Sequence, residues 1–553
     1  MMNVLIVSEP GEGGVFAYVE SLCVFLMDQG IAVHLAYSDV RGSDRLTRLV
    51  ERVRAAGGQA VNLEVGNAVQ WSDFRGFLRL WRLVERVRPD VVHCHSSKAG
   101  VLGRSLALMG VRSSFIYHPH AYYGMRPTRR SRDRIYDLIE TFFGRIGTTV
   151  TVSNDERHLG MNRLRLPADR LELVHNGVDT GRFCPTTPER RRSLRAAFGL
   201  PEAAKVLGSI SRLSAQKDPI TLYKAFGAAC ATDPDIHLFH VGNGDLEGEV
   251  NALIGRLGIA SRVTRLSYLS DPQGFYQAID GLALTSIYEG LSLAALEALA
   301  TDLPLILSRA PGNMDLIGLP LDKAWTAAPG DVAEFTRCIG LWSDRLDHPA
   351  PSNHRAFALS HFEGTKAREK VVRVYRETAA RPPDRLPVWT ARLPLIVFLG
   401  VIAFESTALF TRANTREMLY PLFHFLTRVS YDDFYEWNHY VRKAGHVVGY
   451  GVLSLLFYRL AIYEIPAALQ RAKPYLSFAA AFAATAAVAV LDEWHQTFVP
   501  GRTGTVADVL LDSAAAALAL AAMAAVSFLV LRWQSGEDTL PPPSIAPQAG
   551  SAE

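Results

Sequence analysis

Cysteine is scarce in this sequence, and the few cysteines follow no recognisable spacing. Five are scattered over 553 residues without a Cys-x-x-Cys pair, and none lies between residues 393 and 533. This pattern favours free thiols in a reducing compartment over a disulfide framework. The five are Cys23, Cys94, Cys184, Cys230 and Cys338.

A strong charge imbalance and an N-terminal signal are also missing. The formal net charge of +3 is too small to indicate a nucleic-acid partner. No basic segment precedes an apolar stretch at the N-terminus, where Asn3–Val7 already has the composition of a strand. We therefore expect no cleavable signal, and we expect the first part of the chain to stay in the cytoplasm.

Long apolar runs are absent from residues 1–380 and concentrated in residues 393–533. Four segments there approach the ~20 residues that cross a bilayer, which predicts an all-α four-helix transmembrane domain. Buried helices of a soluble domain are the alternative. We expect residues 381–392 to be a linker and residues 534–553 a disordered tail. The four segments are Leu393–Phe410, Gly445–Ile462, Tyr475–Leu491 and Val506–Leu531.

The most informative stretch is Thr285–Glu297. An apolar strand pattern ends at Thr285, a polar turn follows, and an apolar helix is expected with Gly290 at its start. The backbone N–H groups and dipole of a helix start suit a phosphate, and a residue without Cβ lets the backbone approach a ligand closely.

Two glutamates in this stretch are spaced for separate tasks. Glu289 and Glu297 are eight residues apart, which is about 12 Å along a helix. The carboxylate pair of a hydrolase is about 5–9.5 Å apart, so two separate hydroxyl-binding carboxylates fit better than an acid/base dyad. A capped core helix with one stray glutamate is the structural alternative.

Two cations follow an earlier strand pattern. Arg212 and Lys217 come after the strand-like Val206–Ser211, and Pro219 suits the first turn of the next helix. Cations at the carboxyl end of a strand suit a diphosphate, although ordinary surface charge is the alternative. The next strand pattern ends in the turn Gly242-Asn243-Gly244.

The N-terminal part begins with a predicted βαβ unit. A strand pattern, a glycine turn with Gly13 and Gly14, a helix to Gln29 and a second strand over Ala32–Tyr37 follow one another. Asp39 raises the possibility of a dinucleotide, but the glycines do not match Gly-x-Gly-x-x-Gly, so NAD is not expected.

Four histidines, His93, His95, His118 and His120, stand at the ends of two later strand patterns. A metal site is one interpretation. We favour separate strand-end residues, because no carboxylate completes a ligand set.

These strings, in this order, resemble retaining glycosyltransferases of family 4. The matching strings are Glu-x7-Glu, Arg-x4-Lys, Gly-x-Gly, Asp-x-x-His-x-His ending at His95, and His-Ala-Tyr beginning at His120; the resemblance covers about residues 3–378. It implies an α/β GT-B fold of two Rossmann-like domains. Residues 1–180 would hold the acceptor and residues 181–380 the nucleotide-sugar.

The resemblance also implies roles for single residues. Arg212 and Lys217 would stabilise the leaving diphosphate, Glu289 would hold the sugar and Glu297 the ribose. By that match His120 faces donor and acceptor, and His95 is a weaker candidate for the acceptor. No acidic cluster like a metal-binding Asp-x-Asp appears at the end of a predicted strand, so no metal or cofactor is expected, and the nucleotide-sugar is a substrate. The remaining donor contacts would come from Gly13, Gly14, Gly242, Asn243, Gly244, Gly290 and Leu291.

Five arginines gather between Arg126 and Arg134. A solvated face is the usual reason for such a run. In a chain with apolar spans, contact of Arg129, Arg130 and Arg132 with anionic lipid or an acceptor phosphate is the functional hypothesis.

The apolar region contains two polar strings, Lys-x-x-His-x-x-x-Tyr from Lys443 and Asp-Glu-x-x-Gln…Pro-Gly-Arg…Asp from Asp492. They resemble the VanZ-like family, whose biochemical role does not follow from the residues. The spacing places His446 and Tyr450 on one helix face. Such residues at span ends are either interfacial anchors or a binding site, which we expect near the outer face of the membrane. The set is Lys443, His446, Tyr450, Asp492, Glu493, Gln496, Arg502 and Asp508.

Taken together, the sequence predicts an integral protein of the cytoplasmic membrane with its transferase domains in the cytoplasm. It would add a sugar to a membrane-associated, lipid-linked saccharide in envelope polysaccharide assembly. The alternative is a non-catalytic sensor that binds a nucleotide-sugar and signals to the membrane domain.

Overall fold

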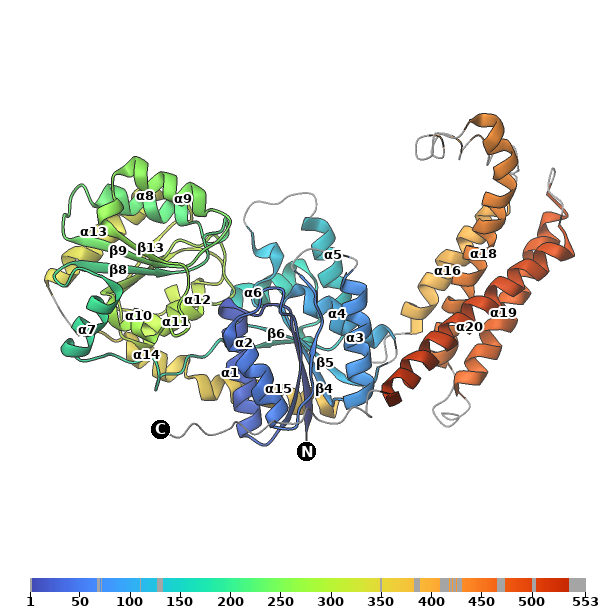
Figure 1. The fold of residues 1–553 in the computed structure, drawn as a ribbon, viewed down its shortest axis with the longest axis horizontal. Helices are drawn as coiled ribbons and strands as arrows, with labels where there is room; N and C mark the ends of the chain where they lie inside the picture. The colour runs from blue at the N-terminus through green and yellow to red at the C-terminus, as the bar shows by residue number, and fades with distance from the viewer. Residues whose placement is uncertain are drawn as a thin grey trace, which may run out of the picture. The chain divides into compact units, whose positions relative to one another are not determined.

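The computed structural model divides into two compact units, Met1–Asp384 and Arg385–Glu553, each of which we describe by itself (Figure 1). The structure describes residues 2–66, 70, 72–109, 111–126, 133–348, 351–381, 388–407, 417, 420, 424, 430–464, 473–499 and 504–536.

The first half of unit 1 is built on a seven-stranded parallel sheet in the order β3-β2-β1-β4-β5-β6-β7. Its central strands are covered on both faces, which is why they are continuous apolar runs; Val4–Val7 are 0% exposed. The strands are β1 (Asn3–Ser8), β2 (Ala32–Tyr37), β3 (Ala60–Asn62), β4 (Val91–His95), β5 (Ser114–His118), β6 (Thr148–Thr151) and β7 (Leu171–Leu173).

Neighbouring parallel strands need a crossover connection, and helices make these connections here. They are α1 (Gly13–Asp28), α2 (Asp44–Ala55), α3 (Ser72–Val87), α4 (Ser97–Leu108), α5 (Asp133–Phe143) and α6 (Asn154–His158).

The second half of unit 1 repeats this architecture with six parallel strands in the order β10-β9-β8-β11-β12-β13. The strands are β8 (Lys205–Ile210), β9 (Ile236–Val241), β10 (Val263–Leu266), β11 (Gly281–Leu284), β12 (Leu305–Ser308) and β13 (Ala324–Ala327). The helices are α7 (Pro188–Phe198), α8 (Pro219–Ala229), α9 (Glu247–Leu257), α10 (Gln273–Ala278), α11 (Leu293–Ala300), α12 (Met314–Ile317), α13 (Val332–Asp347) and α14 (His354–His361).

The helix α15 (Gly364–Ala380) returns to the first sheet. Val371, Val374 and Tyr375 join the core around β1 and α1, and the Tyr375 hydroxyl lies 2.7 Å from Nδ1 of His93. The chain therefore ends unit 1 by packing this helix against the first sheet, although the predicted range 181–380 counts it with the second half.

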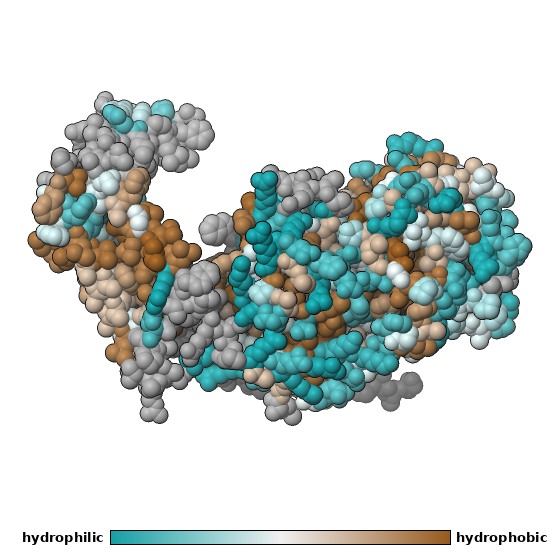
Figure 2. All heavy atoms as spheres, turned by 180° about the vertical axis from the view of Figure 1, so that it is seen from behind, coloured by the Kyte–Doolittle hydropathy of each residue, from teal (hydrophilic) through white to brown (hydrophobic). Residues whose placement is uncertain are grey.

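Unit 2 is helical in its described part. The helices α16 (Val388–Glu405), α19 (Lys473–Gln496) and α20 (Val506–Gly536) accompany α18 (Tyr431–Glu464), which packs against all three. Within the described residues, three segments are long and apolar enough to cross a membrane: Lys443–Ile462, Tyr475–Gln496 and Val506–Ala525. Figure 2 shows broad hydrophobic surface on these helices.

Three boundaries in unit 2 differ from those predicted. The expected linker extended to residue 392, but α16 begins at Val388 and contains Pro394 within its first turns. The long connection expected before the second span is helical from Tyr431 onward. The tail expected from residue 534 is still helical to Gly536. Residues 408–410, at the end of the first predicted span, and residues 537–553 lie outside the described residues.

Candidate active site

The carboxyl edge of the second sheet gathers the charged residues of Thr285–Glu297 and of the turn after β8. The strands β8 and β11 pair directly, and the strand order reverses between them. Ligands of open α/β sheets bind outside the carboxyl ends of the strands at such a point.

The central contact at this edge is an ion pair between the loops after β8 and β11. The Lys217 Nζ atom lies 2.5 Å from Oε1 of Glu289, and the Ser286 hydroxyl donates to the same oxygen at 2.6 Å. Glu289 is only 6% exposed. A carboxylate so buried needs its cation and its hydroxyl donor, so these three residues form one electrostatic unit.

Hydrogen bonds to main-chain carbonyls hold the two loops against each other. The Thr285 hydroxyl donates to the carbonyl of Lys217 at 3.0 Å, and the Ile287 N–H donates to that of Gln216 at 2.8 Å. The Glu289 N–H donates to the carbonyl of Pro311 at 2.8 Å. As a result, Lys217 and Glu289 are fixed by main-chain contacts as well as by their charges.

Arg212 begins the turn between β8 and α8, and its side chain is exposed. The turn after β9 packs against it: Leu213 N–H donates to the carbonyl of Asn243 at 2.8 Å. A Cβ on Gly242, at φ +146, would stand 2.0 Å from the carbonyl oxygen of Ser211, so only glycine fits there. Gly244, at φ +154, packs in the same way on the carbonyl of Leu213. Pro219 is in the first turn of α8, as predicted.

The helix after Glu289 begins later than predicted. It starts at Leu293, because the Ser292 side chain caps it by accepting the Ala295 N–H at 3.4 Å. Gly290 therefore lies in the loop. A Cβ on Gly290 would stand 2.5 Å from the carbonyl oxygen of His120, so its missing side chain admits the backbone of the first domain.

Two further contacts join the predicted donor residues across unit 1. The Asn176 side chain donates to the carbonyl of Leu291 at 2.8 Å. A Cβ on Gly14 would stand 3.9 Å from Leu293, which places the start of α1 close to the start of α11. Gly13, at φ +77, is the first residue of α1.

Glu297 lies on α11, where burial raises the pKa of its carboxyl group to about 7. The Tyr276 hydroxyl and the guanidinium groups of Arg182 and Arg45 oppose that shift. Arg45 comes from α2 of the first domain.

The sequence suggested that the four histidines are separate strand-end residues. This prediction is wrong, because the structure brings them together. β4 and β5 are neighbours in the sheet, with His95 opposite His118. The His118 and His120 rings stack with centroids 4.0 Å apart, and His95 Nδ1 lies 3.0 Å from His120 Nε2. The ring nitrogens of His93, His95 and His118 lie within 4.8 Å of one another, a separation compatible with a shared metal ion. The expectation of no metal stays a prediction.

Burial keeps these imidazoles neutral. It lowers the pKa of His120 to about 3 and the pKa values of His93, His95 and His118 well below the usual range. His120 and Ala121 both have positive φ, +59° and +139°. The backbone that presents His120 to Gly290 is therefore strained.

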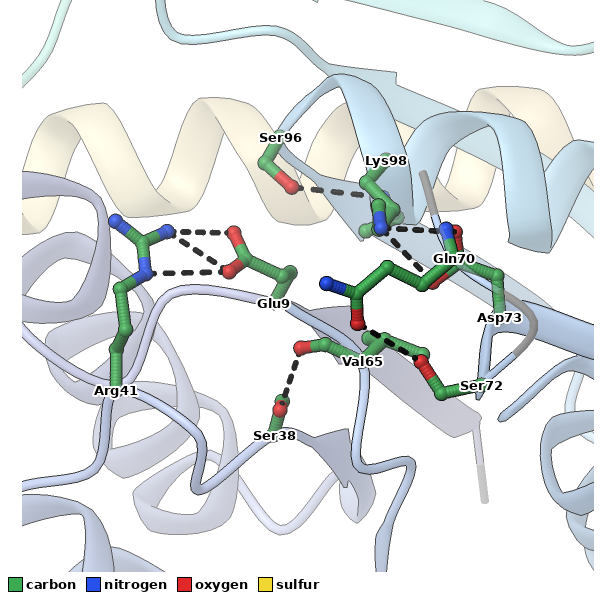
Figure 3. Close-up of polar contacts among 10 residues, drawn as sticks. Glu9, Ser38, Arg41, Val65, Gln70, Ser72, Asp73, Ser96 and Lys98 are labelled. Carbon is green, nitrogen blue, oxygen red and sulfur yellow. Dashed lines mark hydrogen bonds and ion pairs between the residues drawn. The ribbon is translucent and has the colours of Figure 1, made fainter. Parts of the chain in front are cut away.

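Sequence reasoning missed two ion pairs at the carboxyl edge of the first sheet (Figure 3). Arg41 binds both oxygens of Glu9, at 2.8 and 2.7 Å, just after β1. Lys98 lies 2.8 Å from Asp73, joining the starts of α4 and α3. Only the adjacency of β1, β2 and β4 reveals them, and no short motif contains both partners.

A cavity of about 320 Å³ opens elsewhere in unit 1. His175 and Asp315, which lie 2.9 Å apart, are on its wall with His361 and Lys370. None of the predicted site residues lines it, so we do not assign the site there.

Unit 2 brings most of its predicted polar set together. The Tyr450 hydroxyl and the Gln496 amide both donate to Oδ2 of Asp492, each at 3.1 Å. Lys443 lies 3.7 Å from Asp508, and the Thr505 N–H donates to Glu493 at 2.8 Å.

Two further residues, Ser406 and Asp512, join this cluster. The Ser406 hydroxyl contacts Asp492, and His446 lies 3.4 Å from Asp512. Asp512 is fully buried, and its spacing of four from Asp508 is the sequence signal for it.

Four predicted residues lie outside the described part of the chain. They are Arg129, Arg130, Arg132 and Arg502.

Three family models match the chain in succession. The Glycosyltransferase Family 4 model matches residues 12–182, the Glycosyl transferases group 1 model residues 190–345, and the VanZ/LLP1 model residues 392–529. The predicted families are thereby confirmed, in the predicted order.

Curated relatives match parts of the chain. The putative glycosyltransferase EpsD of Bacillus subtilis is 27% identical over 45% of this chain and 66% of its own length. The UDP-Gal:alpha-D-GlcNAc-diphosphoundecaprenol alpha-1,3-galactosyltransferase of Escherichia coli is 25% identical over 52% of this chain and 75% of its own.

Solved structures confirm the GT-B fold. Anabaena Alr3699/HepE in complex with UDP and glucose superposes with a TM-score of 0.58 at 20% identity, covering 68% of this chain and 100% of that one. The sucrose-phosphate synthase of Thermosynechococcus elongatus gives 0.56 at 16% identity, covering 68% and 99%. At these identities the likeness concerns the fold alone.

Proposed function

Because the chain joins a family 4 glycosyltransferase of the GT-B fold to a VanZ/LLP1 domain, we propose that it is a retaining glycosyltransferase. It moves a sugar from a nucleotide-sugar to a membrane-associated, lipid-linked saccharide in envelope polysaccharide assembly. Two of the similar proteins support these substrates. HepE was solved with UDP and glucose, and the Escherichia coli relative is named for a diphosphoundecaprenol acceptor.

The observation that supports this function best is the Lys217–Glu289 pair, 2.5 Å apart at the point where the second sheet reverses its strand order. A leaving nucleoside diphosphate gains negative charge in the transition state. Lys217, with Arg212 on the same turn, supplies positive charge at that place, and preorganised charge of this kind is usually the largest catalytic contribution.

The other groups have complementary tasks in this proposal. Glu289 and Glu297 accept hydrogen bonds from the sugar and the ribose. The bond from the anomeric carbon to the diphosphate breaks while the acceptor oxygen forms its bond on the same face, which gives retention. The acceptor hydroxyl loses its proton to the departing phosphate oxygen, since no described residue at this edge is an obvious base.

We also propose that the protein lies in the cytoplasmic membrane with unit 1 in the cytoplasm, where nucleotide-sugars are made. Four spans would then return the tail to the cytoplasm and place the polar cluster of unit 2 near the outer face, where it could bind an envelope lipid or saccharide. A cysteine at Thr503 should react with a membrane-impermeant thiol reagent on intact cells. Labelling only after the cells are opened would contradict this topology.

The transferase activity itself is tested with the full chain in lipid nanodiscs. The protein is incubated with candidate nucleotide-sugars and lipid-linked saccharide, and both released nucleotide and extended product are measured. Transfer with retained anomeric configuration in the product supports the proposal. Donor binding without nucleotide release would support the rival function, a nucleotide-sugar sensor coupled to the VanZ/LLP1 domain.

A further inference from the structure

Helix α5 is amphipathic, but its apolar face points away from the protein core and its acidic face points toward it. Its large apolar side chains point outward: Ile135 is 60%, Leu138 69% and Phe142 45% exposed. Two of its carboxylates point inward, with Asp133 3% and Glu140 7% exposed. Scattered exposed apolar residues are normal, but a stripe at i, i+3 and i+7 on one helix face marks an interaction surface.

One buried and one partly buried ion pair fix this orientation. Glu140 accepts a hydrogen bond from the Tyr117 hydroxyl at 2.7 Å. It also lies 3.2 Å from Arg104, whose side chain is 0% exposed. Asp137 lies 2.8 Å from Arg163. Rotating α5 to bury its apolar stripe would leave the Arg104 guanidinium buried without its carboxylate, which is strongly unfavourable. The outward apolar face is therefore a built feature of the fold.

The charge around the stripe identifies its partner. All three acids of α5 belong to the contacts just described or are buried, whereas Arg134 and Arg145, at the two ends of the helix, are exposed. In the sequence, four more arginines precede Arg134 within eight residues. Outward apolar residues bordered by arginines suit the headgroup region of an anionic bilayer, into which the apolar face of an interfacial helix enters by about 5–10 Å.

We propose that α5 is an interfacial anchor that docks unit 1 onto a bilayer surface containing anionic lipid, with Ile135, Leu138 and Phe142 inserted. The proposal rests on the proposed function only in assuming that the chain resides in a membrane. It does not depend on the transfer chemistry, so failure of either is recognisable separately.

The test uses the full chain in nanodiscs with Cys184 and Cys230, the two partly exposed cysteines, replaced by serine. A cysteine at Leu138 carries an environment-sensitive fluorophore, and a nitroxide quencher is attached to some of the lipid. A matched control places the cysteine at Leu359, which is 43% exposed on α14. We expect a blue-shifted, lipid-quenched signal from Leu138→Cys and neither effect from Leu359→Cys.

Two further comparisons make the result specific. Quenching should fall to the control level when Ile135 and Phe142 are changed to serine, and should weaken in nanodiscs without phosphatidylglycerol or at high salt. Both replacements are on the surface, so the melting temperature should not change. Absence of lipid quenching would overturn the proposal. So would a blue shift that grows with protein concentration but not with lipid, since that would assign the face to a second copy of the chain.

Discussion

The two parallel sheets of unit 1 share one architecture but present different chemistry at the same edge. The second sheet ends in charged groups, Lys217 and Glu289, fixed 2.5 Å apart by the loops after β8 and β11. The first ends in histidines on β4 and β5 that burial keeps neutral, with the pKa of His120 lowered to about 3. Where the two meet, Gly290 lies against the carbonyl of His120.

Under the proposed function, this difference would divide the two halves of the reaction between the two domains. A leaving diphosphate needs positive charge, which the second domain offers at Arg212 and Lys217. In the proposed function, the acceptor hydroxyl would meet the neutral imidazole of His120 on the other side. Removing the charge from one side should therefore affect chemistry far more than changes that leave it intact.

The largest effect is expected from Lys217→Ala and Arg212→Ala. Each should lower kcat about 10²-fold or more, the usual result of removing one electrostatic stabiliser of a transition state. Initial rates of product formation measure this. Lys224→Ala, an exposed lysine on α8 of the same domain, is the control and should retain full activity. Near-normal turnover in both site variants would remove Lys217 and Arg212 from the mechanism.

Gly290→Ala should be the next most damaging change. Its Cβ would stand 2.5 Å from the backbone oxygen of His120, so either the domains or the strained His120 turn must move. We expect a lower melting temperature and at least about tenfold slower transfer, a typical result of displacing catalytic groups by about 1 Å.

Gly14→Ala is the matched comparison for stability, because its Cβ meets only Leu293 at 3.9 Å. Its melting temperature should equal that of the wild type. If both variants melt alike, the close approach of Gly290 to His120 does not contribute to stability.

A smaller effect concerns the pH dependence of donor binding. Burial raises the pKa of Glu297 to about 7, and a carboxylate must be ionised to accept hydrogen bonds from ribose hydroxyls. The KM for the donor should fall as pH rises from about 6 to about 8, changing by up to tenfold per pH unit below the pKa. In Glu297→Gln the KM should be higher and nearly independent of pH. An unchanged pH profile in that variant would separate Glu297 from the donor.

How much the sequence could predict depends on how local each feature is. Arg212, Lys217 and Pro219 lie within one strand–turn–helix unit, so short-range patterns located them correctly. The histidine cluster and the Glu9–Arg41 pair depend on which strands are neighbours, and the order of strands in a sheet is not encoded in any short motif.

Two helix starts, those of α11 and α16, were predicted at the wrong residue. The start of α11 at Leu293 is marked by Ser292 as its cap, but the apolar run suggested a start at Gly290. The linker was expected to reach residue 392, yet α16 already begins at Val388. The sequence could not predict that the apolar face of α5 points outward, because the same spacing of apolar residues fits a helix packed on a core.

The smallest effect expected is that of a chelator. Transfer should continue in EDTA at nearly the untreated rate, because Arg212 and Lys217 provide the positive charge at the diphosphate. Activity that is abolished by EDTA and restored by magnesium or manganese would show that a metal contributes to that charge.

The most direct test of the account is whether Lys217 recognises a diphosphate. Calorimetric titration of the full chain with UDP, GDP and ADP, and with the corresponding monophosphates, compares the wild type with Lys217→Ala. The account predicts that one diphosphate binds the wild type best and loses about tenfold or more in affinity in the variant, while its monophosphate changes little. Equal affinity of the two proteins for that diphosphate would contradict the assignment of the donor site to the edge of the second sheet.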